Sequence, residues 1–531
     1  MTFEVVSSIA ESTANSATTS QVASGKSHVS KLCWVWLLLS ILLGCFSSGH
    51  WVVPILVWIG PPLVLRFMAA QPNWIGNVCV ILSGYIVFWV TQRGIIPMAH
   101  EEFAVAGCIA ALIGFLPYWI YRRVSERFDS FWITFAFPSM IVFIEYLLVQ
   151  GPFGSWGSMA TTQYRNTALI QILSVGGTSS LVFLICWVGA VIDWIWKHSF
   201  SWAETRSYIT ATIVLLTLVL GLGWWRQVIP LDPAKVVRVG GVVAEDKAFE
   251  HDAIVALVRS VRTGTSITDQ QRKAYMEELN QRTEGFFLRS QNAVQDGAKI
   301  VYWSEAALVM LKEDEADVLK RAATFAENQQ VYLGLAYACI LNQREGPFLE
   351  NKLVLFSPQG RVINDYQKNL IPPGEPSVPG TVEPAFIETD IGAISQVICF
   401  DTDFPSLMRK PGAAGAGIVF APSNDWKDAA EPHLSVAALR SVENGYSLVR
   451  ITSSGISAVV DPRGKLLFEK STYKERRCDF VVDVPLGIGR SIYSWFGESI
   501  AMLSGIVSCI VVVISFLPVG KAKRTHTRNA V

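Results

Sequence analysis

Residues 397–408 have the sequence VICFDTDFPSLM, in which an apolar run ends at Cys399 and aromatic, acidic and Pro-containing sequence follows. An apolar run of this kind predicts a buried strand. Similar runs alternate with helical patterns through residues 235–490, and two of them flank a hairpin turn at SPQG (357–360). The alternation predicts an α/β core, and the paired hairpins predict a two-layer β-sandwich flanked by helices, αββα. At this point Cys399 is either buried packing or a nucleophile at a strand end.

The first 230 residues have the composition of a membrane domain. The chain is 51% hydrophobic and 17% charged, and only 20 of its 88 Asp, Glu, Lys and Arg residues precede residue 231. A helix needs about 20 apolar residues to cross a bilayer. Eight apolar segments are predicted spans: 32–48, 51–68, 74–91, 103–121, 130–149, 178–196, 208–226 and 498–518. The first two are separated only by SGH, which predicts a tight hairpin.

Basic segments indicate how the spans are oriented. KSHVSK precedes the first span, YRRVSER follows the fourth, KHSFSWAETR follows the sixth, and GKAKRTHTR ends the chain. Because Lys- and Arg-rich connections stay in the cytoplasm, we expect the large polar segment on the other side, the periplasm of a bacterium. The predicted parts are a disordered cytoplasmic tail (1–30), a membrane domain of about seven helices (31–229), an extracytoplasmic catalytic domain (230–490), a last transmembrane helix (498–518) and a basic cytoplasmic tail (519–531).

Other classes of site are not supported by the sequence. The formal net charge is zero and no basic face stands out, so we expect no nucleic-acid binding. The nine cysteines form no CxxC pair and no Cys/His cluster with zinc spacing, so we expect neither a metal site nor a disulfide framework. LLGC (42–45) resembles a lipobox, but it lies in the first predicted span and far from the N-terminus for a signal peptide.

Three predicted strands end in polar residues suited to acyl transfer: Glu305, Lys368 and Cys399. Ligands of open α/β folds bind beyond the carboxyl ends of strands, so the three could converge in one pocket. A carboxylate can take the proton of a thiol, and a lysine and the N–H of residue 400 can stabilise an oxyanion. Taken singly, each residue has a simpler explanation: a carboxylate at a helix start, a solvated lysine and a packing cysteine.

The segments YWSEAAL, YQKNLIPPGE and ICFDTDFP resemble, in this order, the Glu–Lys–Cys motifs of the nitrilase (carbon–nitrogen hydrolase) superfamily, and the resemblance covers residues 235–486. More narrowly, the whole chain resembles the apolipoprotein N-acyltransferases, the membrane enzymes that finish bacterial lipoprotein maturation. PSMIVFIEYLLVQGPFGSWGSMATTQY, PSNDW and HLSVAALRSVENGYSLVRITSSGISAVVDPRG carry this narrower resemblance.

The resemblance implies a role for each matching residue. Glu305 would be the general base, Lys368 the oxyanion-stabilising lysine and Cys399 the nucleophile. Glu375, in PPGE, would orient the lysine and the thiol. Other residues implied near the site are Phe400 and Asp401, directly after the nucleophile, and the substrate-binding candidates Phe249, Asn424 and Trp426.

The chain also departs from the acyltransferase pattern in two places. The acyltransferases usually have Tyr then Glu after the nucleophile, where this chain has Phe400 and Asp401, a pair more like that of the soluble amidases. The loop VVAEDKAFEHD lacks the expected Gln/Asn-rich opening and a Trp, and Phe249 is its nearest aromatic residue. Both differences leave the identity of the acyl donor and acceptor open, but they do not change the assignment of the nucleophile.

The resemblance implies a ping-pong reaction without a cofactor at the bacterial inner membrane. Cys399 would take a fatty acyl chain from a phospholipid as a thioester and pass it to the free amine of diacylglyceryl-cysteine of a lipoprotein. Membrane spans suit such substrates, because each buried methylene is worth ~0.8 kcal/mol. Glu145, an acid inside a predicted span, is a further substrate-binding candidate, although pairing with a neighbouring helix is the simpler role. Trp156 and Gln163 lie in a loop that could shape the lipid entrance.

Two other functions remain open from the sequence. A membrane-anchored amidase or nitrilase would hydrolyse a small C–N bond with water as the acceptor, and the Phe400–Asp401 pair is its best support. A transporter or scaffold with a decayed nitrilase domain is a third possibility, against which the intact Glu305, Lys368 and Cys399 argue.

Overall fold

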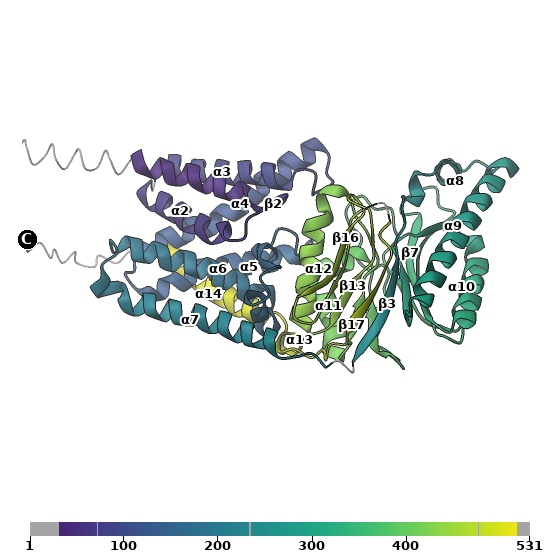
Figure 1. The fold of residues 1–531 in the computed structure, drawn as a ribbon. Helices are drawn as coiled ribbons and strands as arrows, with labels where there is room; N and C mark the ends of the chain where they lie inside the picture. Colours follow the sequence, from purple (N-terminus) through teal and green to yellow (C-terminus); the bar gives the residue numbers. More distant parts are fainter. Residues whose placement is uncertain (1–30, 72, 233–234, 476, 518–531) are drawn as a thin grey trace, which may run out of the picture.

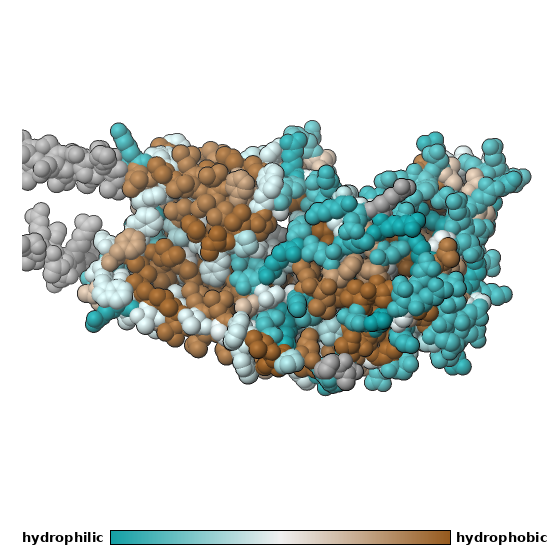
Figure 2. All heavy atoms as spheres, in the orientation of Figure 1, coloured by the Kyte–Doolittle hydropathy of each residue, from teal (hydrophilic) through white to brown (hydrophobic). Residues whose placement is uncertain are grey.

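The computed structural model describes residues 31–517 except 72, 233–234 and 476. Two parts lie end to end, a helical bundle and a β-sandwich (Figure 1). The bundle helices are Lys31–Cys45, α2 Leu56–Ala70, α3 Trp74–Gln92, α4 His100–Ser125, α5 Ala136–Val149, α6 Leu173–Lys197, α7 Trp202–Val228 and α14 Ser499–Phe516. Among the described residues, six helices are long and apolar enough to cross a membrane. Hydrophobic residues cover much of the bundle face in Figure 2, and hydrophilic residues cover the far end of the sandwich.

The start of the second predicted span is not helical. Residues 51–52 belong to a short antiparallel hairpin, β1 Ser47–Ser48 with β2 Trp51–Val52, and α2 begins only at Leu56. Gly49 makes the turn with φ +71°, and a Cβ there would lie 2.0 Å from the Thr91 carbonyl oxygen. The helices on either side of the hairpin, Lys31–Cys45 and α2, are therefore shorter than the predicted spans.

The second part is a sandwich of two sheets. One sheet has the order β17–β3–β4–β6–β7–β8 with β5 paired to β6, and the other has the order β16–β15–β13–β11–β10–β9. The strands of the first are β3 Val236–Val242, β4 Ile300–Trp303, β5 Leu308–Leu311, β6 Tyr332–Ile340, β7 Leu349–Phe356, β8 Val362–Gln367 and β17 Phe480–Pro485. Those of the second are β9 Ile387–Thr389, β10 Gly392–Gln396, β11 Ile418–Phe420, β13 Ser447–Arg450, β15 Ile456–Val460 and β16 Leu466–Ser471. A two-stranded sheet pairs β12 Ser423–Asn424 with β14 Thr452–Ser453.

Helices cover both outer faces, which completes the αββα fold that the sequence predicts. α9 Asp269–Gln295 and α10 Glu315–Gln329 pack on the first sheet, while α11 Pro405–Ala414 and α12 Ala430–Asn444 pack on the second (Figure 1). Between the sheets, the rings of Tyr302 and Phe420 stack with their centroids 4.0 Å apart. The Tyr302 hydroxyl donates to Gln396 at 2.9 Å, so the phenol is satisfied inside the core.

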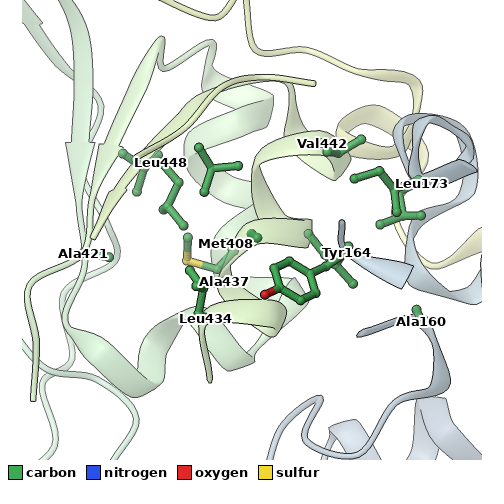
Figure 3. Close-up of a cluster of buried hydrophobic side chains, with 14 of the residues drawn as sticks. Ala160, Tyr164, Leu173, Met408, Ala421, Leu434, Ala437, Val442 and Leu448 are labelled. Carbon is green, nitrogen blue, oxygen red and sulfur yellow. The ribbon is translucent and has the colours of Figure 1, made fainter. Parts of the chain in front are cut away.

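The two parts share one hydrophobic core. Figure 3 shows Ala160, Tyr164 and Leu173 of the bundle beside Leu434, Ala437 and Val442 of α12, with Met408, Ala421 and Leu448 on the side away from Leu173 and Ala160. The shared core fixes the second sheet against the bundle. Residues after β10, β11 and β13 therefore face the connections between bundle helices.

The connections of the bundle divide between its two ends. Those at 93–99 and 150–168 touch the sandwich, since Gly94 accepts a hydrogen bond from Trp426 and Glu431 accepts one from Tyr164. At the other end, Arg123 and Arg127 donate to the last carbonyls of α14, and Lys197 pairs with Asp129 at 2.9 Å. These basic residues thus lie away from the sandwich.

Candidate active site

Cys399 opens a short 3-10 turn, η6 Cys399–Asp403, directly after the second sheet's strand β10. Its φ is +48°, a left-handed conformation that costs a non-glycine residue about 1–2 kcal/mol. The turn is held by the Cys399 N–H, which donates to Pro422 at 2.9 Å, and by the Thr402 hydroxyl, which donates to the Cys399 carbonyl at 2.8 Å. The side chain is 6% exposed and lines a cavity.

Glu305, Lys368 and Glu375 meet on the other side of this cavity. Glu305 follows β4 and Lys368 follows β8, so both come from the first sheet. The Lys368 Nζ lies 2.9 Å from Glu305 Oε1 and 2.6 Å from Glu375 Oε2, and Lys368 is only 1% exposed. Asn351 on β7 donates to Glu305 Oε1 at 2.7 Å. The second oxygen of Glu305, Oε2, is buried and has no hydrogen-bond partner among the described residues.

The ionisation of these groups follows from their burial and pairing. Burial lowers the pKa of Lys368, but Glu305 and Glu375 raise it more, so the pKa lies well above its usual value and the ammonium persists. Burial and the nearby Glu305 raise the pKa of Cys399, against the opposing effect of Lys368. The resting site therefore holds a neutral thiol, and a carboxylate has to remove its proton before the sulfur can attack.

The cavity has a volume of about 480 Å³ and walls from both parts of the molecule. Pro97 comes from the α3–α4 connection and Trp156 from the loop after α5, while the rest of the wall comes from the sandwich. The sandwich residues predicted for the site that line it are Phe249, Glu305, Lys368, Glu375, Cys399, Phe400, Asn424 and Trp426. The structure thus brings together in one cavity most of the residues that the sequence singled out.

Trp426 and Trp156 form the wall nearest the bundle. Their rings lie 5.7 Å apart, and the Trp426 Nε1 donates to the Gly94 carbonyl at 2.8 Å. Asn424 faces the thiol with its main chain, since its carbonyl oxygen is 4.0 Å from the Cys399 Sγ. A loop of the bundle therefore holds an aromatic wall of the cavity in place.

Asp401 does not line the cavity. It is fully buried and accepts hydrogen bonds at 2.8–3.2 Å from the N–H groups of Ile398, Asn369 and Leu370 and from the Tyr366 hydroxyl. Burial raises its pKa to about 6 against these hydrogen bonds. Asp401 thus ties the turn that carries Cys399 to the loop that follows Lys368.

Glu145 lies apart from the cavity. Its carboxylate accepts from the Ser158 hydroxyl at 2.8 Å and from the Met159 N–H at 3.3 Å, and it lines a separate hollow of about 30 Å³. The partner is therefore the loop after α5, not a neighbouring helix and not a ligand site at Cys399. Of the two loop residues singled out from the sequence, Trp156 lines the cavity, whereas Gln163 donates to the Pro54 carbonyl at 2.7 Å.

Sequence reasoning missed a second charged cluster beside the thiol, made by Asp403, Asp425, His433 and Arg450. One signal was available, an arginine inside the otherwise apolar stretch SLVRI. Cys399 Sγ, an oxygen of Asp425 and a ring nitrogen of His433 lie within 4.8 Å of one another, a donor set that zinc accepts. Arg450, however, lies 3.0 Å from Asp425, so a second cation there would meet a guanidinium charge.

The chain is similar to several known proteins. Residues 253–484 match the model of the carbon-nitrogen hydrolase family. The apolipoprotein N-acyltransferase of Geobacter metallireducens is 26% identical over 81% of this chain and 81% of its own length. That of Gloeobacter violaceus is 23% identical over 89% of this chain and 92% of its own length. An amidase structure from Nesterenkonia sp. is 21% identical, covering 48% of this chain and 92% of its own, with a TM-score of 0.37. Residues 253–484 thus form a carbon-nitrogen hydrolase domain, and the chain as a whole is similar to the apolipoprotein N-acyltransferases.

Proposed function

We propose that this protein is an N-acyltransferase that moves a fatty acyl chain from a membrane phospholipid to the free amine of diacylglyceryl-cysteine of a lipoprotein. The relatives' names support the reaction class. The observation that carries the proposal is the position of the Cys399 cavity, which has walls from both the bundle and the sandwich. A chain held in a bilayer beside the bundle can reach the thiol without crossing water, which matters because each methylene costs ~0.8 kcal/mol to expose.

The proposed first step forms a thioester. Glu305 takes the Cys399 proton, and the sulfur attacks the carbonyl carbon of the phospholipid ester. Lys368 and the N–H of residue 400 stabilise the oxyanion. The ester C–O bond breaks, Glu305 returns the proton to the departing alkoxide, and lysophospholipid leaves.

The proposed second step forms the amide. The amine of the lipoprotein attacks the thioester carbon and gives a proton to Glu305, and the C–S bond breaks. The proton then returns to the sulfur, which restores the free enzyme. No atom of water enters the products, which distinguishes this reaction from amide hydrolysis.

We propose the bacterial inner membrane as the location, with the sandwich on the periplasmic side. The support is the placement of Arg123, Arg127 and Lys197 at the end of the bundle away from the sandwich, because such residues mark the cytoplasmic side.

Intact-protein mass spectrometry after incubation with phospholipid alone tests the first step. We expect a fatty-acyl adduct that maps to Cys399, is released by neutral hydroxylamine, and is lost in Cys399→Ala but kept in the control Cys478→Ala, another buried cysteine of the sandwich. Absence of the adduct under conditions in which the protein hydrolyses a small amide would replace the proposal with an amidase. A Cys399→Ala protein that still transfers acyl chains would remove Cys399 as the nucleophile.

A further inference from the structure

The charged cluster on the second-sheet side of Cys399 is held by short contacts among its own members, while both oxygens of Asp403 and the Nε of Arg450 have no hydrogen-bond partner among the described residues. His433 of α12 lies 3.2 Å from Asp403 through Nε2 and 2.8 Å from Asp425 through Nδ1. The Arg450 guanidinium of β13 contacts both oxygens of Asp425 at 3.0 Å, and its Nη2 also lies 2.7 Å from the His433 Nδ1. All four side chains are 3% exposed or less, so water screens their charges little.

The cluster reaches the nucleophile from two directions. Asp403 ends the same turn that Cys399 begins, so its contact with His433 restrains the turn. Asp425 and His433 both place an atom within 4.8 Å of the Cys399 Sγ. Glu305 and Lys368 line the same cavity as Cys399 and come from the first sheet, so charged groups from both sheets surround the thiol.

The charges of the cluster balance only while His433 is protonated. Asp403 and Asp425 carry two negative charges, and Arg450 carries one positive charge. Burial and Arg450 lower the pKa of His433, but the opposing effect of Asp403 and Asp425 is larger and raises the pKa to about 9. With the imidazolium present the cluster is neutral, and without it one negative charge remains beside the sulfur, where it opposes formation of a thiolate.

We infer that His433 is a positioning residue for the nucleophile, which as an imidazolium fastens the Cys399 turn to Asp425 and cancels the charge of that carboxylate. The inference rests on Cys399 being the nucleophile of the proposed function. Glu305 remains the base, and His433 exchanges no proton with the substrate.

Carbamidomethylation of Cys399 by iodoacetamide tests this inference without any lipid, so its outcome is separate from that of the acyl-transfer test. The rate is measured by peptide mass spectrometry on the full-length protein between about pH 6 and pH 10, where it follows the thiolate fraction. A like or opposite charge at 4–6 Å shifts a pKa by roughly one unit or more, which is tenfold or more in rate.

Three variants test whether charge balance is the mechanism. The two single variants should change the alkylation rate in opposite directions, and the double variant should cancel the change. His433→Asn leaves one excess negative charge, so we expect about tenfold slower alkylation at neutral pH. Asp425→Asn leaves one excess positive charge, so we expect faster alkylation. The double variant is neutral again, and we expect its rate to return to within about threefold of the unmodified protein's.

Two internal controls keep the result interpretable. Cys339 in β6 is fully buried, so its label in the same digest reports unfolding, and rates are compared only where Cys339 stays unlabelled. His198→Asn changes a histidine at the far end of the bundle and should leave the Cys399 rate unchanged. An unchanged rate in His433→Asn, or a double variant slower than either single variant, would overturn the inference and leave His433 a packing residue.

Discussion

Replacing Asp401 by Asn should loosen the nucleophile turn while changing hardly any volume. The four hydrogen bonds to this carboxylate come from the N–H groups of Ile398, Asn369 and Leu370 and from the Tyr366 hydroxyl. An Asn oxygen can keep the bonds from Asn369 and Leu370, and the Tyr366 hydroxyl can turn to accept from the new NH₂ group. The Ile398 N–H, one residue before Cys399, then has no acceptor.

One buried N–H without an acceptor costs about 1–3 kcal/mol. A cost near 2 kcal/mol shifts the equilibrium from the anchored toward the loosened turn by roughly 30-fold. We therefore expect acylation of Cys399 to slow by about that factor. Asp401→Ala leaves three such N–H groups without an acceptor and should slow acylation by at least about another 30-fold. Tyr366→Phe is the matched control, because it removes one donor and leaves no N–H unpaired, which costs about 1 kcal/mol.

The pH dependence gives a second readout of the same substitution. The pKa of Asp401 is raised to about 6, so the protein with its natural Asp401 binds a proton there as the pH falls through 6. The anchored turn therefore holds this proton more tightly than an exposed carboxylate would and gains stability below that pH, so the natural protein should not lose acylation rate relative to Asp401→Asn as the pH falls through 6. The assay is acyl-adduct formation followed by mass spectrometry. An Asp401→Asn protein that acylates within about threefold of the natural rate at pH 8 would refute the reasoning.

Lys368→Met should lower the unfolding temperature of the full chain in detergent, because it leaves Glu305 and Glu375 buried without their shared cation, at a cost of about 3–5 kcal/mol. Adding Glu375→Gln should recover part of the loss, and a double variant that melts below the single one would contradict the ion-pair explanation. Glu145→Leu should slow acylation roughly 30-fold through the loop that carries Trp156, since it removes two hydrogen bonds of about 1 kcal/mol each. Glu204→Gln, at an exposed acid of α7, is the control, and equal rates in both would separate Glu145 from the cavity wall.

The strand ends were predictable because they depend on local sequence. Apolar runs before Glu305 and Cys399, and the hairpin at SPQG before Lys368, mark the strands, and the αββα layers then bring their carboxyl ends to one place. The resemblance to known motifs supplied the roles that spacing alone left open. The sequence predicts a tight turn between two helices near residue 49 but not the β-strands Ser47–Ser48 and Trp51–Val52, since their apolar residues match a helical span equally well.

The contacts of Asp401 and His433 could not be predicted, because they depend on pairing across distant segments. Asp401 meets residues 369 and 370, about thirty positions earlier in the chain, only through the packing of the two sheets. Asp403 and Asp425 meet at His433 only once α12 lies against η6. No local pattern encodes which buried acid will face which base.

The chain of the sandwich continues into bundle helices at both ends, α7 before β3 and α14 after β17. α14 packs along α5, and a Cβ on Gly505 would lie 2.8 Å from the Phe143 ring, so this second attachment is held closely against the bundle. A rigid body attached at two separate points can rotate only about the line that joins them. The hydrophobic core that α12 shares with the bundle opposes this remaining rotation, so the sandwich cannot swing away from the bundle as a tethered domain would, and every turnover has to be completed with the walls of the cavity fixed in place.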